Sequence, residues 1–179
     1  MAAPITITEV RTLLAQKNLA PLKSLGQNFL IDRNFLTKIV KAGELSREDL
    51  VLEIGPGLGG LTEQLVQQAG QVVAVEYDRG LFAALTENLA EYPQLQLVNR
   101  DFLEFDLKEL DAGGSQWKLK VIANLPYYIT SPIIFKLLES RLNWRLMIFL
   151  VQKEVALRVA AKPGGKDYGA LTVMLKYYG

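Results

Sequence analysis

Short apolar segments alternate with longer amphipathic segments through most of the chain. Five apolar runs recur every 20 to 27 residues, at 50–54, 72–75, 95–98, 119–123 and 146–151. Several are apolar on both faces, which is typical of parallel strands buried between two helical layers. Helix-length segments lie between them, at 61–69, 79–90, 131–138 and 153–161. The alternation predicts βαβ units with right-handed crossovers, and so an α/β fold with a doubly wound, mostly parallel sheet.

The two ends of the chain add further elements to this core. Residues 6–19 and 32–44 have the apolar spacing and caps of amphipathic helices. The apolar run 171–178 is predicted to be a sixth strand, after which the chain stops at Gly179. We therefore expect one domain over residues 1–179, truncated before its last strands, with an N-terminal helical segment at 1–45 and a sheet core at 46–179.

Composition removes several kinds of chemistry. The chain has no Cys and no His, which excludes a thiolate nucleophile, a Cys/His zinc site and a Ser-His-Asp triad. Catalysis would have to rely on positioning, hydrogen bonding or a cofactor. No apolar run approaches the roughly 18 residues of a membrane span, and the start lacks the features of a secretory signal. We expect a cytoplasmic protein without a membrane partner.

The net charge of +1 conceals a strong segregation along the chain. Residues 1–48 carry +3, residues 49–117 carry −9 and residues 118–179 carry +7. An acidic centre between basic flanks indicates that a polyanion is held by one part of the molecule only. The alternative is a set of solvated helix faces with different signs.

Two strand ends predict an adenosine-containing cofactor. The first strand runs into a glycine-rich turn in which Gly55, Gly57 and Gly60 satisfy G-x-G-x-x-G, a spacing that allows a sharp turn and close approach to a ligand. Glu76 ends the second strand 21 positions after Gly55, where an acid can accept hydrogen bonds from both ribose hydroxyls. These features do not separate NAD from S-adenosylmethionine, and a turn without a ligand remains an alternative.

The third strand ends in groups suited to the adenine of such a cofactor. Asp101 can accept from its exocyclic amine while Phe102 packs on the ring, or Asp101 can simply cap the following turn.

The fourth strand ends in Asn124-Leu125-Pro126-Tyr127, which suits the exocyclic amine of a substrate base. An exocyclic amine is a poor nucleophile because its lone pair is delocalised. The Asn124 oxygen and the carbonyl of Leu125 or Pro126 can accept its two hydrogens and favour a pyramidal nitrogen, while Pro126 stiffens the loop and Tyr127 stacks on a flipped base. A loop packed on the core is the alternative.

Six segments in register resemble one family. They are Gly26-Gln27-Asn28-Phe29-Leu30, Glu53-Ile54-Gly55-Pro56-Gly57, Val75-Glu76, Asp101, Asn124-Leu125-Pro126-Tyr127 and Val151-Gln152-Lys153-Glu154-Val155-Ala156. Their order and spacing from residue 20 onward are similar to those of the ribosomal RNA adenine dimethyltransferases, particularly the bacterial small-subunit (KsgA) branch. The resemblance implies a Rossmann-like class I methyltransferase that uses S-adenosyl-L-methionine.

The resemblance also implies roles for further residues. Asn28 and Leu30, with Gln27 beside them, would contact the methionine end of the cofactor, and Gly55 would lie beneath it. Phe149 would pack against the target adenine, with core packing of a strand residue as the alternative. The basic residues expected on the substrate side are Lys23, Arg33, Arg141, Arg145, Lys153 and Arg158.

The activity implied by the resemblance is dimethylation of N6 on two adjacent adenines in the 3′-terminal hairpin of small-subunit (16S) rRNA. The substrate would be an immature ribosomal subunit, and the enzyme a monomer without a metal. Family members continue into a small helical C-terminal domain beyond the segment that corresponds to residue 179, so we expect residues 1–179 to bind the cofactor but to act inefficiently on the native particle. Three alternatives stay open: a large-subunit rRNA methyltransferase of the antibiotic-resistance type, a nicotinamide-dependent oxidoreductase, and a non-catalytic RNA-binding factor.

Overall fold

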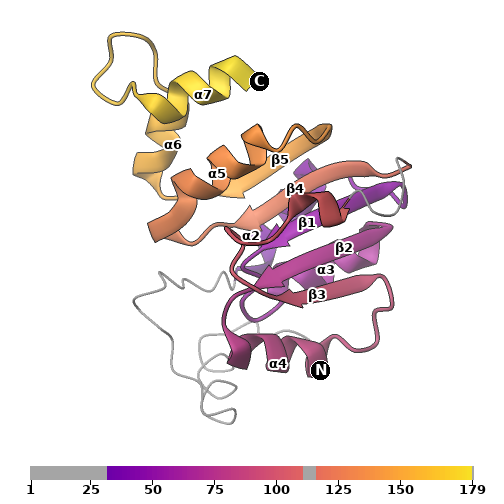
Figure 1. Ribbon diagram of the computed structural model, residues 1–179. Helices are drawn as coiled ribbons and strands as arrows, with labels where there is room; N and C mark the ends of the chain where they lie inside the picture. The colour runs from indigo at the N-terminus through magenta and orange to yellow at the C-terminus, as the bar shows by residue number, and fades with distance from the viewer. Residues whose placement is uncertain (1–31, 111–115, 179) are drawn as a thin grey trace.

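A computed structural model describes residues 32–110 and 116–178 of the chain (Figure 1). The helix predicted at residues 6–19 lies outside this part of the chain. Within it, the strands are β1 (Asp49–Ile54), β2 (Gln71–Glu76), β3 (Leu95–Asn99), β4 (Lys118–Asn124) and β5 (Trp144–Leu150). The helices are α2 (Arg33–Ala42), α3 (Gly60–Gln68), α4 (Arg79–Asn88), α5 (Thr130–Glu139), α6 (Lys153–Val159) and α7 (Ala170–Tyr178), with 3₁₀ turns η2 (Leu107–Leu110) and η3 (Tyr127–Ile129).

The five strands form one parallel sheet in the order β3-β2-β1-β4-β5. After β1 the chain moves outward to β2 and β3, and it then returns to place β4 on the other side of β1. This reversal between β1 and β4 is the point at which ligands bind in open α/β sheets, beyond the carboxyl ends of the strands. The doubly wound architecture expected from the sequence is confirmed.

Two apolar layers cover the two faces of the sheet, because successive side chains of a buried strand point to opposite sides. On one face α2 and α3 pack against Val51 of β1 and Val72 of β2. On the other face α5 and α7 pack with Leu50 and Leu52 of β1. Figure 1 shows the helices on both sides of the twisted sheet. Burial on both faces explains why the strands lack polar alternation in the sequence.

The sixth strand predicted at 171–178 is wrong, because residues 170–178 form helix α7. The segment is apolar and partly β-branched, which favoured a strand. Its buried positions, however, are the adjacent Leu171 and Thr172, and Leu175 one turn later packs on the same core, as on one helix face. The Thr172 hydroxyl also donates to the Arg158 carbonyl, which ties α7 to α6.

A buried ion pair joins β4 to the start of β1. The ammonium of Lys120 lies 3.1 Å from Oδ1 of Asp49 and donates to the carbonyls of Gly43 and Glu44. Both side chains are almost inaccessible to solvent. Removing one partner would leave the other charge buried and uncompensated, which costs far more than losing an exposed pair.

We therefore expect Lys120→Met to lower the free energy of unfolding by about 3 to 5 kcal/mol. Lys118→Met removes a lysine two positions away that pairs with Glu48 at the surface, and its effect should be much smaller because water screens an exposed pair. Urea denaturation of both variants measures the difference. Equal losses would show that the buried pair has no special weight.

Candidate active site

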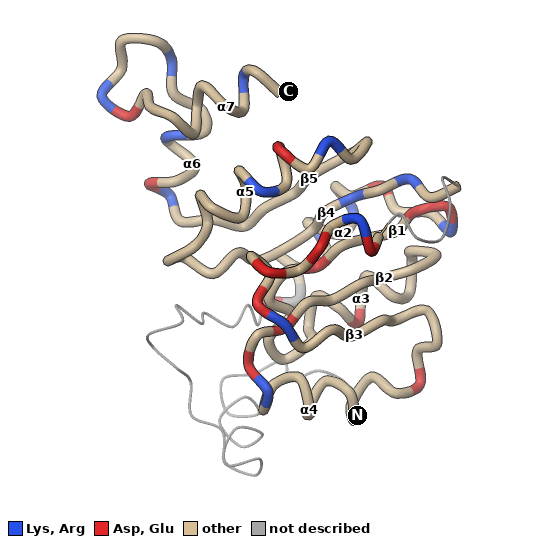
Figure 2. The backbone as a smooth tube through the Cα atoms, viewed as in Figure 1, with Lys and Arg blue, Asp and Glu red and all other residues tan. Residues whose placement is uncertain are grey.

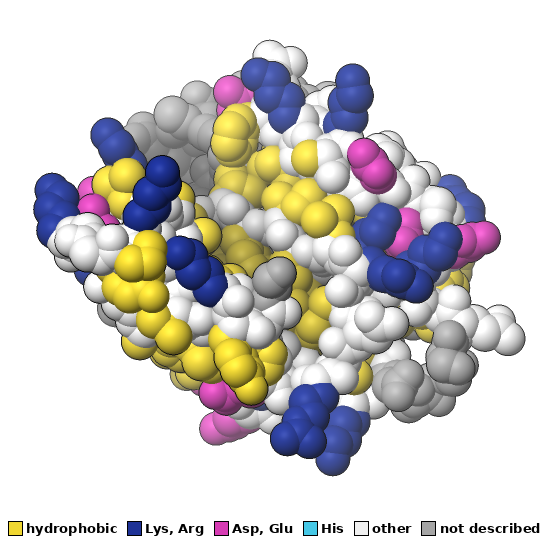
Figure 3. All heavy atoms as spheres, turned by 90° about the horizontal axis from the view of Figure 1, so that it is seen from above, with side chains coloured by type: hydrophobic (Ala, Val, Ile, Leu, Met, Phe, Trp, Pro, Cys, Tyr) yellow, Lys and Arg dark blue, Asp and Glu magenta, His cyan; other side chains and the backbone are white. Residues whose placement is uncertain are grey.

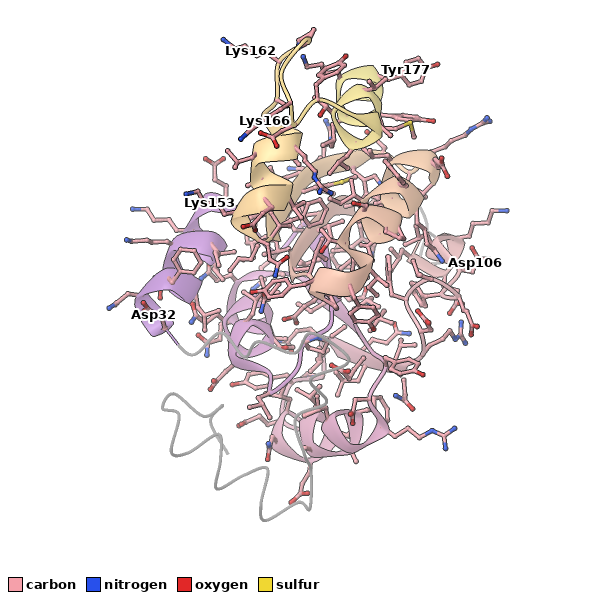
Figure 4. All side chains as sticks on the ribbon, turned by 90° about the vertical axis from the view of Figure 1, so that its left-hand side faces the viewer. Asp32, Asp106, Lys153, Lys162, Lys166 and Tyr177 are labelled. Atoms are coloured by element: carbon pink, nitrogen blue, oxygen red, sulfur yellow. The ribbon has the colours of Figure 1, made fainter. Side chains whose placement is uncertain are left out.

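Polar loops gather at one edge of the sheet, where β1, β2, β3 and β4 end. This edge faces the viewer in Figure 4, and Figure 2 shows acidic positions clustered on the loops that follow β2 and β3. Residues predicted separately from four strand ends are therefore brought together. Gln27, Asn28, Leu30 and Lys23 lie outside the described residues.

The turn after β1 needs glycine at three positions. Gly55, Gly57 and Gly59 have φ angles of 66°, 62° and 85°, a region that residues with a Cβ rarely adopt. A Cβ on Gly59 would also come within 2.8 Å of Leu85, so α3 packs closely against α4 at this turn. A Cβ on Gly55 would lie 3.6 Å from the ring of Pro126, which places the glycine turn directly beside the loop after β4.

Glu76 is held in place by backbone donors from two loops. Its Oε2 accepts the Gly57 N–H at 3.0 Å, and its Oε1 accepts the Asp78 N–H at 2.9 Å. Burial raises the pKa of Glu76, and these two donors oppose the rise by stabilising the charged form. The Asn99 amide, which sequence reasoning did not single out, donates to the carbonyls of Glu76 and Tyr77. Glu76 is therefore a fixed acceptor beside the glycine turn.

Glu53, in β1, is the most deeply buried acid of the site, with 1% of its surface exposed. Burial raises its pKa to about 8, and the nearby carboxylate of Glu76 adds to the rise. A hydrogen bond with the Thr62 side chain opposes this rise without cancelling it. A buried carboxyl that keeps its proton at neutral pH can donate as well as accept a hydrogen bond.

The raised pKa of Glu53 predicts a pH-dependent stability. The folded protein keeps a proton on Glu53 up to about pH 8, whereas the unfolded chain loses it near its ordinary pKa of 4.5. The stabilisation that comes from this difference in pKa is therefore complete below pH 4.5 and is lost as the pH rises to 8. Over this range the free energy of unfolding falls by up to about 1.4 kcal/mol per pH unit. Glu53→Gln removes this titration, so we expect the variant to lose less stability than wild type between pH 5.5 and 8.

Urea denaturation at several pH values checks this expectation. Glu91→Gln, at an exposed position, is the matched control and should follow the wild-type pH profile. Parallel profiles for wild type and Glu53→Gln would contradict the assignment.

The loop after β3 is fixed to helix α5. Oδ1 of the partly buried Asp101 accepts the Leu103 N–H at 2.8 Å, so this residue does cap the turn. Phe102 is only 4% exposed and stacks on Phe105 within the core, which leaves little of its ring accessible to a ligand. Lys136 of α5 donates to the Leu103 carbonyl and lies 5.4 Å from the Phe102 ring centroid. These contacts of Lys136, which the sequence did not reveal, hold the loop that carries Asp101 against α5.

The loop after β4 distinguishes the two candidate carbonyls. The Pro126 carbonyl accepts from the Ile129 N–H at 3.3 Å and from the Thr130 hydroxyl at 3.0 Å. In residues 32–110 and 116–178 no donor reaches the Leu125 carbonyl, while the Leu125 N–H donates to Leu150 of β5. Leu125 itself is buried, so it anchors the loop. The Pro126 carbonyl is therefore occupied by Ile129 and Thr130, whereas the Leu125 carbonyl has no donor within the described residues.

Aromatic residues surround this loop. Tyr127 is partly buried, whereas Tyr128 and Tyr77 are more than half exposed. Partial burial raises the pKa of Tyr128, and the charge of Asp101 raises it further, which places this phenol near the acid of the β3 loop. Neither Tyr77 nor Tyr128 was expected from the sequence. Phe149 lies in β5 opposite Ala123 of β4, partly buried and packed on the core.

Within the described residues, the basic side chains predicted to bind RNA lie at three separate places. Lys153 and Arg158 are exposed on α6, which follows the carboxyl end of β5. Arg141 and Arg145 are exposed at the amino end of β5, at the opposite edge of the sheet. Arg33 opens α2.

Comparison with known proteins identifies the family. A model of the family described as ribosomal RNA adenine dimethylase matches residues 20–179. The chain belongs to the ribosomal RNA adenine dimethylase family. Its match spans both the strand-end loops described above and the segment at 26–30. The family resemblance seen in the sequence is confirmed.

Similar members of the ribosomal RNA adenine dimethylase family carry one name. Proteins called ribosomal RNA small subunit methyltransferase A are 51% identical in Moorella thermoacetica and 49% identical in Halothermothrix orenii, each over 93% of this chain. The matched region is 60% and 56% of those proteins, respectively. The chain thus spans less than two thirds of the length of these relatives.

Solved structures confirm the fold. A dimethyladenosine transferase from Plasmodium falciparum aligns with a TM-score of 0.68 at 32% identity, over 80% of this chain and 50% of that one. The 23S rRNA methyltransferase ErmE aligns with a TM-score of 0.63 at 33% identity, over 73% of this chain and 50% of that one. The fold is that of the class I methyltransferases. No helix in the described residues is long and apolar enough to span a membrane.

Proposed function

We propose that this chain is the catalytic domain of an rRNA adenine N6,N6-dimethyltransferase that uses S-adenosyl-L-methionine. The observation that carries the proposal is the contact between two loops. Gly55 lies against Pro126, so the glycine turn of a cofactor site adjoins the Asn124–Tyr127 loop at the switch point of the sheet. Glu76 and Asp101 end the neighbouring strands at the same edge. A methyl donor and an acceptor amine can therefore meet there.

The cofactor side consists of fixed acceptors and a close backbone approach. Glu76 would accept from the ribose hydroxyls and Asp101 from the adenine amine, while Gly55 and Gly57 allow the cofactor to approach the backbone. The buried Glu53 carboxyl, which keeps its proton up to about pH 8, is suited to a hydrogen-bonding group of the ligand. Asn28 and Leu30, with Gln27, are proposed for the methionine end. When bound, S-adenosyl-L-methionine supplies an electrophilic methyl group on sulfonium.

The substrate side activates a weak nucleophile. The Asn124 side-chain oxygen and the Leu125 carbonyl would accept the two hydrogens of the adenine amine, which holds its lone pair toward the methyl carbon. The Pro126 carbonyl is committed to Ile129 and Thr130 and plays no part in this step. The cofactor would supply the methyl group, and the proton of the methylated amine would be free to leave to water, so no side-chain base is needed. Tyr127 and Phe149 would pack against the flipped adenine.

The cofactor assignment is tested by calorimetric titration. S-adenosyl-L-methionine should bind with 1:1 stoichiometry, whereas NAD should release no binding heat. Binding of NAD alone would favour the oxidoreductase alternative and overturn the proposal.

The proposed substrate is small-subunit rRNA within an immature ribosomal subunit, because the similar relatives are named small subunit methyltransferase A. We further propose a monomeric, cytoplasmic enzyme without a metal. The likeness to ErmE makes large-subunit rRNA the second candidate. Radiolabelled methyl transfer to immature small subunits and to protein-free large-subunit rRNA, assayed side by side, distinguishes them. Label only in the large-subunit RNA would reverse the assignment.

A further inference from the structure

A strongly basic surface extends from the active-site edge along α6 to α7. We call it the α6 ridge and define it by its five exposed cations. They are Lys153, Arg158, Lys162, Lys166 and Lys176. Only two acids, Glu154 and Asp167, accompany them between residues 152 and 178. The ridge therefore carries an excess of positive charge, in contrast to the acidic loops of the cofactor side.

The ridge begins beside the reacting loop. Asn124 of β4 is paired with Leu150, the last residue of β5, and α6 starts three residues later at Lys153. Figure 4 shows Lys153, Lys166 and Lys162 in succession along α6 and the loop above it, with their side chains on the same side. The seven residues of α6 span about 10 Å. The positive charge thus leads away from the site along α6 and the loop that follows it.

The loop between α6 and α7 is ordered by its own turns and projects into solvent. The Gly165 N–H donates to the Lys162 carbonyl at 3.0 Å, and the Tyr168 N–H donates to the Gly165 carbonyl at 3.1 Å. Gly164, with φ at 82°, has nothing within 4 Å of where its Cβ would stand. The loop is therefore an exposed turn, held by its own hydrogen bonds, that carries Lys162 and Lys166.

Aromatic rings stand among these cations. The ammonium of Lys176 lies 5.6 Å from the ring centroid of Tyr168, and Tyr177 is 79% exposed. In Figure 3 Lys and Arg side chains alternate with apolar ones at the left of the view, over the α6–α7 end of the molecule. Cations that bind phosphates, interleaved with rings that stack on unpaired bases, are the features of a surface for single-stranded or looped RNA.

We propose that the α6 ridge binds the RNA backbone that flanks the target adenine, with Lys162 and Lys166 as phosphate contacts. The proposal rests on the proposed function, because it takes the same RNA as its ligand. The proposal also divides the basic residues that the sequence predicted to bind RNA. Arg141 and Arg145 lie at the opposite edge of the sheet and are excluded from this surface.

The double variant Lys162→Gln/Lys166→Gln tests the ridge, with Arg141→Gln/Arg145→Gln as a control that removes the same charge elsewhere. The ligand is a synthetic hairpin with the 3′-terminal sequence of small-subunit rRNA, titrated at several salt concentrations. The ridge variant should bind about tenfold more weakly at 0.1 M salt, and the magnitude of its slope of log K against log salt should fall by about one per lost phosphate contact. The control should match wild type, and both variants should keep wild-type affinity for S-adenosyl-L-methionine.

Wild-type RNA affinity and salt slope in the ridge variant would overturn the proposal, as would equal losses in both variants. Methyl transfer separates this outcome from failure of the proposed function. If wild type transfers methyl groups but the ridge variant has an unchanged KM for RNA, the surface is wrong while the function stands. If wild type binds the hairpin through the ridge but transfers no methyl to any RNA, the function is wrong while the surface stands.

Discussion

Asn124→Ala is expected to reduce methyl transfer by about 10²- to 10³-fold, the usual cost of losing a hydrogen-bonding group that acts in the transition state. The side-chain oxygen at position 124 is one of two acceptors that hold the adenine amine in its reactive geometry. The other, the Leu125 carbonyl, is part of the backbone and survives the substitution. The loss should appear in kcat, measured as single-turnover transfer of labelled methyl groups at saturating RNA.

Binding measurements separate this role from a structural one. Asn124→Ala should bind rRNA nearly as wild type, because the acceptor acts on the reacting amine rather than on the RNA backbone. Asn143→Ala, at an exposed position before β5, is a matched control and should keep the wild-type rate. An unchanged rate in Asn124→Ala would favour the non-catalytic RNA-binding alternative.

Glu76→Gln is expected to weaken S-adenosyl-L-methionine binding by at least about tenfold, because hydrogen bonds to a charged group are worth roughly 1.5 to 3 kcal/mol and the amide has only one accepting oxygen. The fold should keep most of its stability, because the amide oxygen of Gln can still accept one of the two backbone N–H groups that Glu76 holds. Calorimetry and urea denaturation of the same preparation measure both quantities.

Loss of cofactor affinity with retained stability identifies Glu76 as a ligand-binding group. Glu76→Ala should lose affinity further, because it also removes the acceptor of the Gly57 and Asp78 N–H groups. Glu76→Gln with wild-type affinity would contradict the ribose assignment.

Most of the fold was predictable because a parallel sheet imposes a simple pattern. Strands buried on both faces are short apolar runs, and the observed bounds of β1 and β2 differ from the prediction by only one residue at either end. The last segment failed because its apolar content is equally compatible with strand and helix. Only its packing against α5 and α6 decides for a helix, and packing of that kind involves residues far apart in the sequence.

The site was predictable as far as it is encoded at strand ends. Glu76 and Asn124 are the last residues of β2 and β4, and Asp101 follows β3. They were predictable from these positions because topology brings the strand ends to one edge. Two other features depend on the packing of α5 against the loops. They are the hydrogen bond from Lys136 to the Leu103 carbonyl and the one from Thr130 to the Pro126 carbonyl. Neither has a local signal in the sequence, and the same holds for the separation of Arg145 from Lys153 across the sheet.

The central claim is tested most directly by the product of the reaction. The chain is incubated with labelled S-adenosyl-L-methionine and immature small ribosomal subunits, and the rRNA is then digested and its nucleosides separated. The account predicts label in N6,N6-dimethyladenosine, mapped to two adjacent adenines of the 3′-terminal hairpin, and none with Asn124→Ala. Label in a different nucleoside, or equal label with the variant, would contradict it.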